Sequence, residues 1–186
     1  MTNLIGLSGS LRAGSFNTGL LHAAAEMVPA ESELSVKTIH GIPLYDGDLE
    51  ARQGIPLAVL ELGKAIAEAD GLILATPEYN NSIPGAFKNA IDWLSRIDDT
   101  NRPVFAGKRV AVIGASPGGF GTLLSQNAWL PVLRTLETCP WFGGRLLVSH
   151  AAGLFDGDGR LADDAARKKL REFVCGFVAF ARSTGD

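Results

Sequence analysis

The sequence predicts an α/β fold in which a doubly wound parallel sheet of five strands carries helices on both faces. Two observations lead to this prediction. Short apolar segments alternate with longer segments whose apolar residues recur at helical spacing. Several of the short segments are nearly continuous hydrophobic runs, as expected of strands that are buried on both faces of a sheet. Such alternation implies right-handed crossover connections and a parallel sheet.

Five short segments rich in Leu, Ile or Val are the predicted strands: Asn3–Ser8, Glu33–Ile39, Gly71–Thr76, Arg109–Ala115 and Arg145–Ser149. Helices are predicted over Thr18–Met27, Pro56–Ala69, Pro84–Arg96, Leu123–Leu136 and Leu170–Ala181. The third of these has apolar residues at i, i+3, i+4 and i+7, and its proline suits the first helical turn. The stretches rich in turn residues are predicted to be irregular: Gly41–Gly54, Ile97–Gly107 and Ala152–Gly159.

The composition is that of a single globular domain over residues 1–186. The net charge is only −3 and no basic cluster is present, so nucleic acid and anionic membranes are not expected partners. No apolar run approaches the roughly 20 residues that span a bilayer. The first residues lead into a strand without a charged leader, so we expect a cytoplasmic protein. Cys139 and Cys175 are expected to be buried free thiols.

Five parallel strands usually take one of two doubly wound arrangements. In the flavodoxin-like order, 2-1-3-4-5, ligands bind beyond the carboxyl ends of strands one and three, where the strand order reverses. The loops after these two strands should then carry the unusual residues. They do, so we predict the flavodoxin-like order.

The loop Ser8–Asn17, after the first predicted strand, has the composition of a phosphate site. Its two glycines let the backbone approach a ligand, and the following helix offers free N–H groups and the positive end of its dipole. Side-chain donors and one positive charge come from Ser10, Arg12, Ser15 and Asn17. The alternative is a Ser/Gly-rich helix cap. Arg12 favours the phosphate, because a helix N-terminus needs no nearby cation.

Two better-known phosphate motifs do not fit this loop. The spacing from Gly9 to Gly14 begins like a Walker A loop, but Ser15 and Phe16 stand where Lys and then Ser or Thr are required. Gly9 does not begin a GxGxxG motif, and no acidic residue ends the second strand to hold a ribose. A phosphomonoester therefore fits better than a nucleoside triphosphate or a dinucleotide.

Two further loops have the residues of a ring-binding site. Thr76–Gly85 places an aromatic and three amide or hydroxyl side chains between two prolines, as a rigid rim for a flat heteroaromatic ring requires. An ordinary polar turn capped by Ser82 is the alternative. Ser116–Thr122 is rich in glycine, so its backbone N–H groups can face a developing negative charge. A plain glycine-rich turn is the alternative there.

The remaining conspicuous residues indicate structure rather than chemistry. No histidine has a nucleophile or a carboxylate pair beside it in the sequence, so surface or core positions are expected for His22, His40 and His150. No metal-ligand cluster stands out. Core or subunit-interface positions are expected for Trp129, Trp141 and Phe142.

The stretches GSLRAGSFN (Gly9–Asn17) and PEYNNSIPGAFKNAIDWLSR (Pro77–Arg96) resemble the NAD(P)H-dependent FMN reductase family. Within it they are most similar to the bacterial quinone and chromate reductases. The second motif is long and specific, and the pattern agrees with the family from residue 1 to about residue 122. The resemblance implies a flavodoxin-like fold and bound FMN, with NADPH or NADH as co-substrate. It also implies homodimers or homotetramers built partly through the helix Pro84–Arg96.

The resemblance assigns site residues one by one. The FMN phosphate would be held by Ser10, Arg12, Ser15 and Asn17, with help from Thr18. One side of the isoalloxazine would be lined by Pro77, Glu78, Tyr79 and Asn80. Asn81 departs from the family, whose close relatives often carry an aromatic or other residue there, and this position bears on the width of the ring pocket. The remaining flavin contacts would come from Ser116, Gly118 and Gly119.

The expected activity is hydride transfer from NAD(P)H through FMN to a small-molecule acceptor: a quinone, or else an azo dye, chromate or free flavin. Because FMN carries the chemistry, no catalytic side chain is expected. A flavodoxin-type electron carrier is the first alternative, which Arg12 and the small net charge disfavour. A flavin-free regulatory domain on the same fold is the second, and it leaves Arg12 and Pro77–Asn80 without a purpose.

Overall fold

The strands form one parallel sheet in the flavodoxin-like order, as predicted. The computed structural model describes residues 1–99 and 101–183. Its strands are β1 (Thr2–Ser8), β2 (Ser32–Thr38), β3 (Gly71–Ala75), β4 (Arg109–Ala115), β5 (Cys139–Pro140) and β6 (Leu146–Val148). The order across the sheet is β2-β1-β3-β4-β5, with β6 also paired to β4. The order therefore reverses between β1 and β3, and the carboxyl ends of these strands lie at one edge of the sheet.

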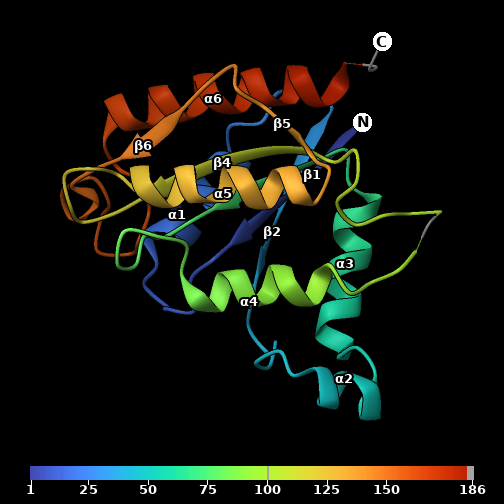
Figure 1. The fold of residues 1–186 in the computed structure, drawn as a ribbon. Helices are drawn as coiled ribbons and strands as arrows, with labels where there is room; N and C mark the ends of the chain where they lie inside the picture. Colours follow the sequence, from blue (N-terminus) through green and yellow to red (C-terminus); the bar gives the residue numbers. More distant parts are fainter. Residues whose placement is uncertain (100, 184–186) are drawn as a thin grey trace.

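Helices cover both faces of the sheet. They are α1 (Phe16–Ala25), α2 (Gly47–Gln53), α3 (Leu57–Glu68), α4 (Gly85–Leu94), α5 (Leu123–Thr135) and α6 (Asp164–Arg182), with a 3₁₀ turn at Ala151–Gly153. Apolar residues of α1 and α6 pack on one face, and those of α3, α4 and α5 pack on the other. Figure 1 shows α6 and α4 on opposite sides of the sheet. None of the described helices has the length and apolar character needed to cross a membrane.

The central strand β3 shows why the strand segments of the sequence are nearly continuous apolar runs. All five of its residues are buried. Leu72 and Leu74 face the layer of α3, α4 and α5, whereas Ile73 and Ala75 face α1 and α6. Side chains alternate across a strand, so a strand between two helical layers needs apolar residues at every position.

The fifth position of the sheet is shared by two short strands, where one strand was predicted. β5 pairs with the start of β4 and β6 pairs with its end. Between them the chain leaves the sheet to place the Trp141 indole against Phe173, with ring centroids 4.9 Å apart. Gly143 and Gly144 allow the chain to pass the indole, because a Cβ on Gly143 would lie 2.4 Å from the Trp141 Nε1.

The helix α2 lies within Gly41–Gly54, which was predicted to be irregular. Its N-cap Asp46 accepts a hydrogen bond from the Asp48 N–H, and none of its residues is buried. It lies away from the sheet (Figure 1). Glu50 links it to the end of α4, accepting from Arg96 at 3.1 Å and from the Tyr45 hydroxyl at 2.9 Å. The hydrogen bond to Glu50 raises the pKa of the Tyr45 phenol.

Both cysteines are free, and both are exposed, so the prediction that they are buried is wrong. Cys175 lies on α6 but falls outside the apolar stripe that faces the sheet. Cys139 lies on the two-residue strand β5. The predicted irregular stretch Ile97–Gly107 forms no helix or strand in its described part, and Thr100 lies outside the described residues.

Candidate functional site

Three loops begin side by side at the carboxyl edge of the sheet. The backbone ladder continues past the strand ends: the Gly9 N–H donates to the Ala75 carbonyl, and the Thr76 N–H donates to the Ile113 carbonyl, both at 2.9 Å. The first residues of the loops after β1 and β3 are therefore each held to the neighbouring strand, β3 and β4 respectively. The three sets of sequence-predicted site residues lie on these loops.

In the first loop, hydroxyl groups organise the turn into α1. Ser15 is the N-cap and its Oγ accepts from the Thr18 N–H at 3.3 Å. The Ser10 Oγ accepts from the Arg12 N–H at 3.3 Å, and the hydroxyls of Ser8 and Thr18 are 2.8 Å apart. The cap interpretation is thus correct for Ser15. It does not account for Arg12, whose exposed side chain extends from the loop.

Asn17 has a structural role that the sequence did not reveal. Its Nδ2 donates to the Ala115 carbonyl and its Oδ1 accepts from the Ala115 N–H, both at 2.9 Å. The side chain is buried, with 4% of its surface exposed. Both polar atoms are engaged with the end of β4, which leaves Asn17 with one Nδ2 hydrogen and the backbone N–H in the first turn of α1 as its remaining donors.

The first loop fits a phosphate group. The first turn of α1 carries no acidic residue, and the N–H groups there have no helical partner. A Cβ on Gly14 would meet nothing within 4 Å, so space is open beside the backbone. A cavity of about 350 Å³ also adjoins this turn, but Asp156 and Asp158 are among the residues that line it and Arg12 is not, so it does not count toward the phosphate site.

The second loop is a tight turn at its tip. The backbone groups of Tyr79 and Ser82 hydrogen-bond to each other in both directions, at 3.2 and 3.1 Å. Asn80 and Asn81, between them, have φ of +51° and +61°. Positive φ at both central positions is the type I′ turn, and asparagine tolerates it better than most residues. This backbone requirement is a physical reason for asparagine at position 81.

Glu78 connects the second loop to the third. Its Oε2 accepts from the N–H groups of Leu124 and Ser125, at 2.8 and 3.0 Å, and so caps the start of α5. The carboxylate is therefore committed to a helix N-terminus, where negative charge is favourable. Pro77 is buried and Tyr79 is half exposed, so the rim of the loop presents an aromatic ring.

The third loop is closed by backbone bonds from the segment after β6. The His150 N–H donates to the Gly118 carbonyl and the Ala151 N–H donates to the Ser116 carbonyl, both at 3.0 Å. Gly118 and Gly119 are exposed. A Cβ on Gly119 would lie 3.7 Å from the His150 Nε2, so the imidazole is beside this turn. The sequence predicts only a surface or core position for His150, because no nucleophile or carboxylate pair stands beside it in the chain.

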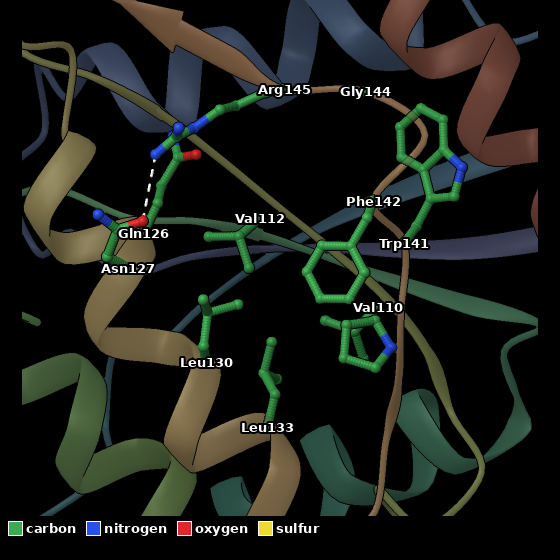
Figure 2. A pocket seen from close by; sticks show the side chains of 11 residues that line it. Val110, Val112, Gln126, Asn127, Leu130, Leu133, Trp141, Phe142, Gly144 and Arg145 are labelled. Carbon is green, nitrogen blue, oxygen red and sulfur yellow. Dashed lines mark hydrogen bonds between the residues drawn. The ribbon is translucent and has the colours of Figure 1, made fainter.

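A separate cavity of about 260 Å³ lies between α5 and the segment that joins β5 to β6 (Figure 2). Its apolar wall includes Val112 and Leu130, and Arg145 lies at one end, 3.2 Å from the Asn127 Oδ1. None of the residues that line this cavity belongs to the three loops. The cavity is therefore distinct from the candidate site.

Comparisons with known proteins identify the family. The sequence profile of the NADPH-dependent FMN reductase family matches residues 2–153. The chain is 43% identical to an NAD(P)H-dependent FMN reductase of Pseudomonas aeruginosa, over 91% of this chain and 89% of the relative. It is 36% identical to a 2-hydroxy-1,4-benzoquinone reductase of a Burkholderia species, over 94% and 93% of the two chains.

A solved structure of a related enzyme has the same fold. The flavoenzyme FerB of Paracoccus denitrificans, an NAD(P)H:(acceptor) oxidoreductase, superimposes with a TM-score of 0.84 at 32% identity. The match covers 97% of each chain. The resemblance drawn from the motifs after β1 and β3 is thus confirmed, together with the fold. The chain is an oxidoreductase of the NADPH-dependent FMN reductase family, with FMN as its cofactor and NAD(P)H as its reductant.

Proposed function

We propose that this enzyme passes electrons from NAD(P)H to a quinone, as a single-domain, cytoplasmic protein. The observation that carries the proposal is that three loops begin at one edge of the sheet. The first has open space for a phosphate beside Gly14. The second and third would bind a flat ring, one as its rim and the other through a glycine-rich turn. The quinone acceptor is supported by the Burkholderia relative, which is named for a benzoquinone. Azo compounds, chromate and free flavin are further acceptors to assay.

The phosphate of FMN would bind at the start of α1. The exposed guanidinium of Arg12 supplies positive charge, and the first turn of α1 supplies N–H groups. Charge-assisted hydrogen bonds of this kind are about twice as strong as neutral ones. Besides the Asn17 backbone, the contributing residues would be Ser10, Ser15 and Thr18.

The ring would lie across the other two loops. Pro77, Glu78, Tyr79, Asn80 and Asn81 would line one side of it, on the turn described above. The N–H groups of Gly118 and Gly119 and the hydroxyl of Ser116 would face its pyrimidine edge, because the Ser116 N–H already donates to the Val148 carbonyl at 2.9 Å. Bound FMN supplies two-electron chemistry between NAD(P)H and the acceptor. Exposed backbone N–H groups at that edge favour negative charge there, which is the protein's contribution to the reaction.

We also propose that the enzyme is a homodimer or homotetramer that uses α4. Large apolar side chains near this helix are exposed, including Leu44 at 81%. Asn89 and Trp93 of α4 hold the Leu44 segment in place, because both donate to the Pro43 carbonyl at 2.8 and 2.9 Å. An apolar surface that is held rigid suits contact with a second copy.

The proposal is tested on purified protein loaded with FMN. We expect slow NAD(P)H oxidation alone and rapid oxidation when 1,4-benzoquinone is added, with hydroquinone as the product. An electron carrier of the flavodoxin type would bind FMN but need a separate reductase for turnover. Failure to bind FMN would contradict the proposed site, and turnover with every acceptor except quinones would contradict the proposed substrate.

Arg12 provides a sharper test of the phosphate end. Arg12→Gln should weaken FMN binding about tenfold, the effect of one charge-assisted hydrogen bond. Riboflavin, which lacks the phosphate, should bind both proteins alike. Flavin fluorescence quenching measures both dissociation constants. Arg52→Gln, an exposed arginine on α2, is the matched control and should change neither.

A further inference from the structure

We propose that His40 is a positioning residue of the phosphate site, although it lies on the loop after β2 and outside every motif described above. In this role it holds the Leu11 carbonyl, and with it the turn that carries Arg12. The inference rests on the proposed binding of the FMN phosphate by Ser8–Asn17. It adds a residue that neither the motifs nor the resemblance assigns to that site.

The contacts of the imidazole are specific. Its Nε2 is 3.2 Å from the Leu11 carbonyl oxygen, and its Nδ1 is 3.0 Å from the Thr38 Oγ1. A carbonyl oxygen can only accept, so the Nε2 carries the proton. In the neutral ring the Nδ1 then accepts from the Thr38 hydroxyl. The two bonds fix both the tautomer and the orientation of the ring.

The base of His40 is rigid. The preceding residue, Ile39, is buried with 3% of its surface exposed, in the layer beneath β1 and β3. Thr38 is the last residue of β2 and pairs with Ser8, the last residue of β1. The imidazole therefore extends from a fixed strand end toward a loop that starts at the neighbouring strand end.

The loop that it contacts has little else to hold it. Leu11, Arg12, Ala13 and Gly14 are all exposed. Within the described residues, the hydroxyl contacts of this turn are long, at 3.4 Å from the Ser10 N–H to the Ser8 Oγ and 3.3 Å from the Arg12 N–H to the Ser10 Oγ. Ordering a loose loop at binding costs entropy, which a fixed contact removes in advance.

The hydrogen bond from His40 also sets the direction in which the Leu11 carbonyl dipole points. The carbonyl of Leu11 is engaged by a donor from the β2 side of the loop. A free carbonyl oxygen in a phosphate loop could turn toward the anion and repel it, whereas N–H groups attract it. Holding the Leu11 carbonyl thus favours the conformation in which the loop presents donors.

The experiment compares FMN with riboflavin in four variants. His40→Ala should raise the dissociation constant of FMN about three- to tenfold, the effect of one hydrogen bond. His40→Gln, whose amide can donate to the same carbonyl, should recover most of the affinity. Thr38→Val should give a smaller loss, because it frees the ring without removing the donor. Lys37→Gln, an exposed cation on the same strand, is the control and should behave as wild type.

The ligand comparison separates positioning from general stability. In all variants the dissociation constant of riboflavin should stay within about twofold of the wild-type value. The melting temperature should stay within about 2 °C of wild type. Unchanged FMN affinity in His40→Ala would overturn the inference. An equal loss for FMN and riboflavin would also overturn it, since the effect would not involve the phosphate. A wild-type protein that binds no FMN would instead contradict the proposed function.

Discussion

At the scale of single residues, Gly9 and Gly14 occupy the same loop for different physical reasons. A Cβ on Gly9 would lie 2.0 Å from the Phe87 Cδ1, and Phe87 is fully buried against Trp129. A Cβ on Gly14 would meet nothing within 4 Å. Gly9→Ala should therefore lower the free energy of unfolding by about 1–3 kcal/mol, the usual cost of overpacking. Urea denaturation measures it.

Gly14→Ala is the matched control for this prediction. It should leave stability within about 0.5 kcal/mol of wild type, as surface substitutions usually do. If its added methyl group intrudes on the phosphate, it should weaken FMN binding without changing stability. Equal destabilisation by the two alanines would show that loop flexibility, and not the contact with Phe87, explains Gly9.

Asn17 shows what local sequence cannot reveal. The sequence predicts a phosphate donor at this position, and that role stays a prediction. The structure adds a bond in each direction to the backbone of Ala115, 98 residues away. Removing such a side chain leaves a buried N–H and a buried carbonyl without partners, which costs more than the bonds themselves contribute.

At the scale of elements, Glu78 fixes where α5 begins. The N-cap residue of this helix, Thr122, has a φ of +67° and makes no capping bond with its own side chain. Glu78 from the second loop takes that role for two N–H groups. Glu78→Ala should lower the free energy of unfolding by about 1 kcal/mol, and Glu78→Gln by less.

Thermal or urea unfolding checks this prediction, with Glu61→Ala as control. Glu61 is an exposed acid on α3 and should have little effect. The cap also holds the rim of the second loop, so Glu78→Ala should weaken riboflavin binding as well as FMN binding. Loss of FMN binding alone would argue against this account.

Elements with strong apolar patterns were predicted to within a few residues, with the first four strands as the clearest cases. The helix α2 was missed because it buries nothing, so no periodic apolar signal marks its seven residues. The split of the fifth strand was missed because its cause is tertiary. Trp141 leaves the sheet to reach Phe173 on α6, and no pattern near residue 141 encodes that contact.

At the scale of the molecule, Arg182 joins the last helix to the first two strands. Its guanidinium donates to the Thr2 hydroxyl at 2.9 Å, to the Ser32 hydroxyl at 2.9 Å, and to the carbonyls of Ala30 and Glu31 at 3.1 and 3.3 Å. Arg182→Ala should cost about 1 kcal/mol of stability. It should also speed amide exchange at the start of β1 more than elsewhere.

Arg171→Ala on the same helix is the control, because Arg171 is an exposed arginine of α6 away from β1. Hydrogen exchange measured by mass spectrometry or NMR compares the amide exchange rates at the start of β1 in the two variants. A uniform increase in exchange over the whole chain would mean that Arg182 acts on global stability and does not hold this end locally.

At this scale the strand order, which is confirmed, is what gives the predicted location of the site. A strand order that reverses between β1 and β3 brings the loops after them together, and their residues could be read from the sequence. The contacts between loops were not predictable. His40 and His150 reach the first and third loops from β2 and β6, and such approaches depend on the packed sheet rather than on any local motif.

Asn17 and Ala115 join the helix after β1 to the end of β4, across the position of β3. The two ends of the site are thus held at a set spacing before any ligand arrives. A preassembled site loses little conformational freedom on binding, so capture of the cofactor needs no slow rearrangement. Differences in affinity for the cofactor would then lie mainly in its dissociation rate. Moving α1 away from the sheet to release the cofactor would require breaking the two buried hydrogen bonds between Asn17 and Ala115. The slow loss of the cofactor would thus depend on the contact between α1 and β4 as well as on the residues of the loop Ser8–Asn17.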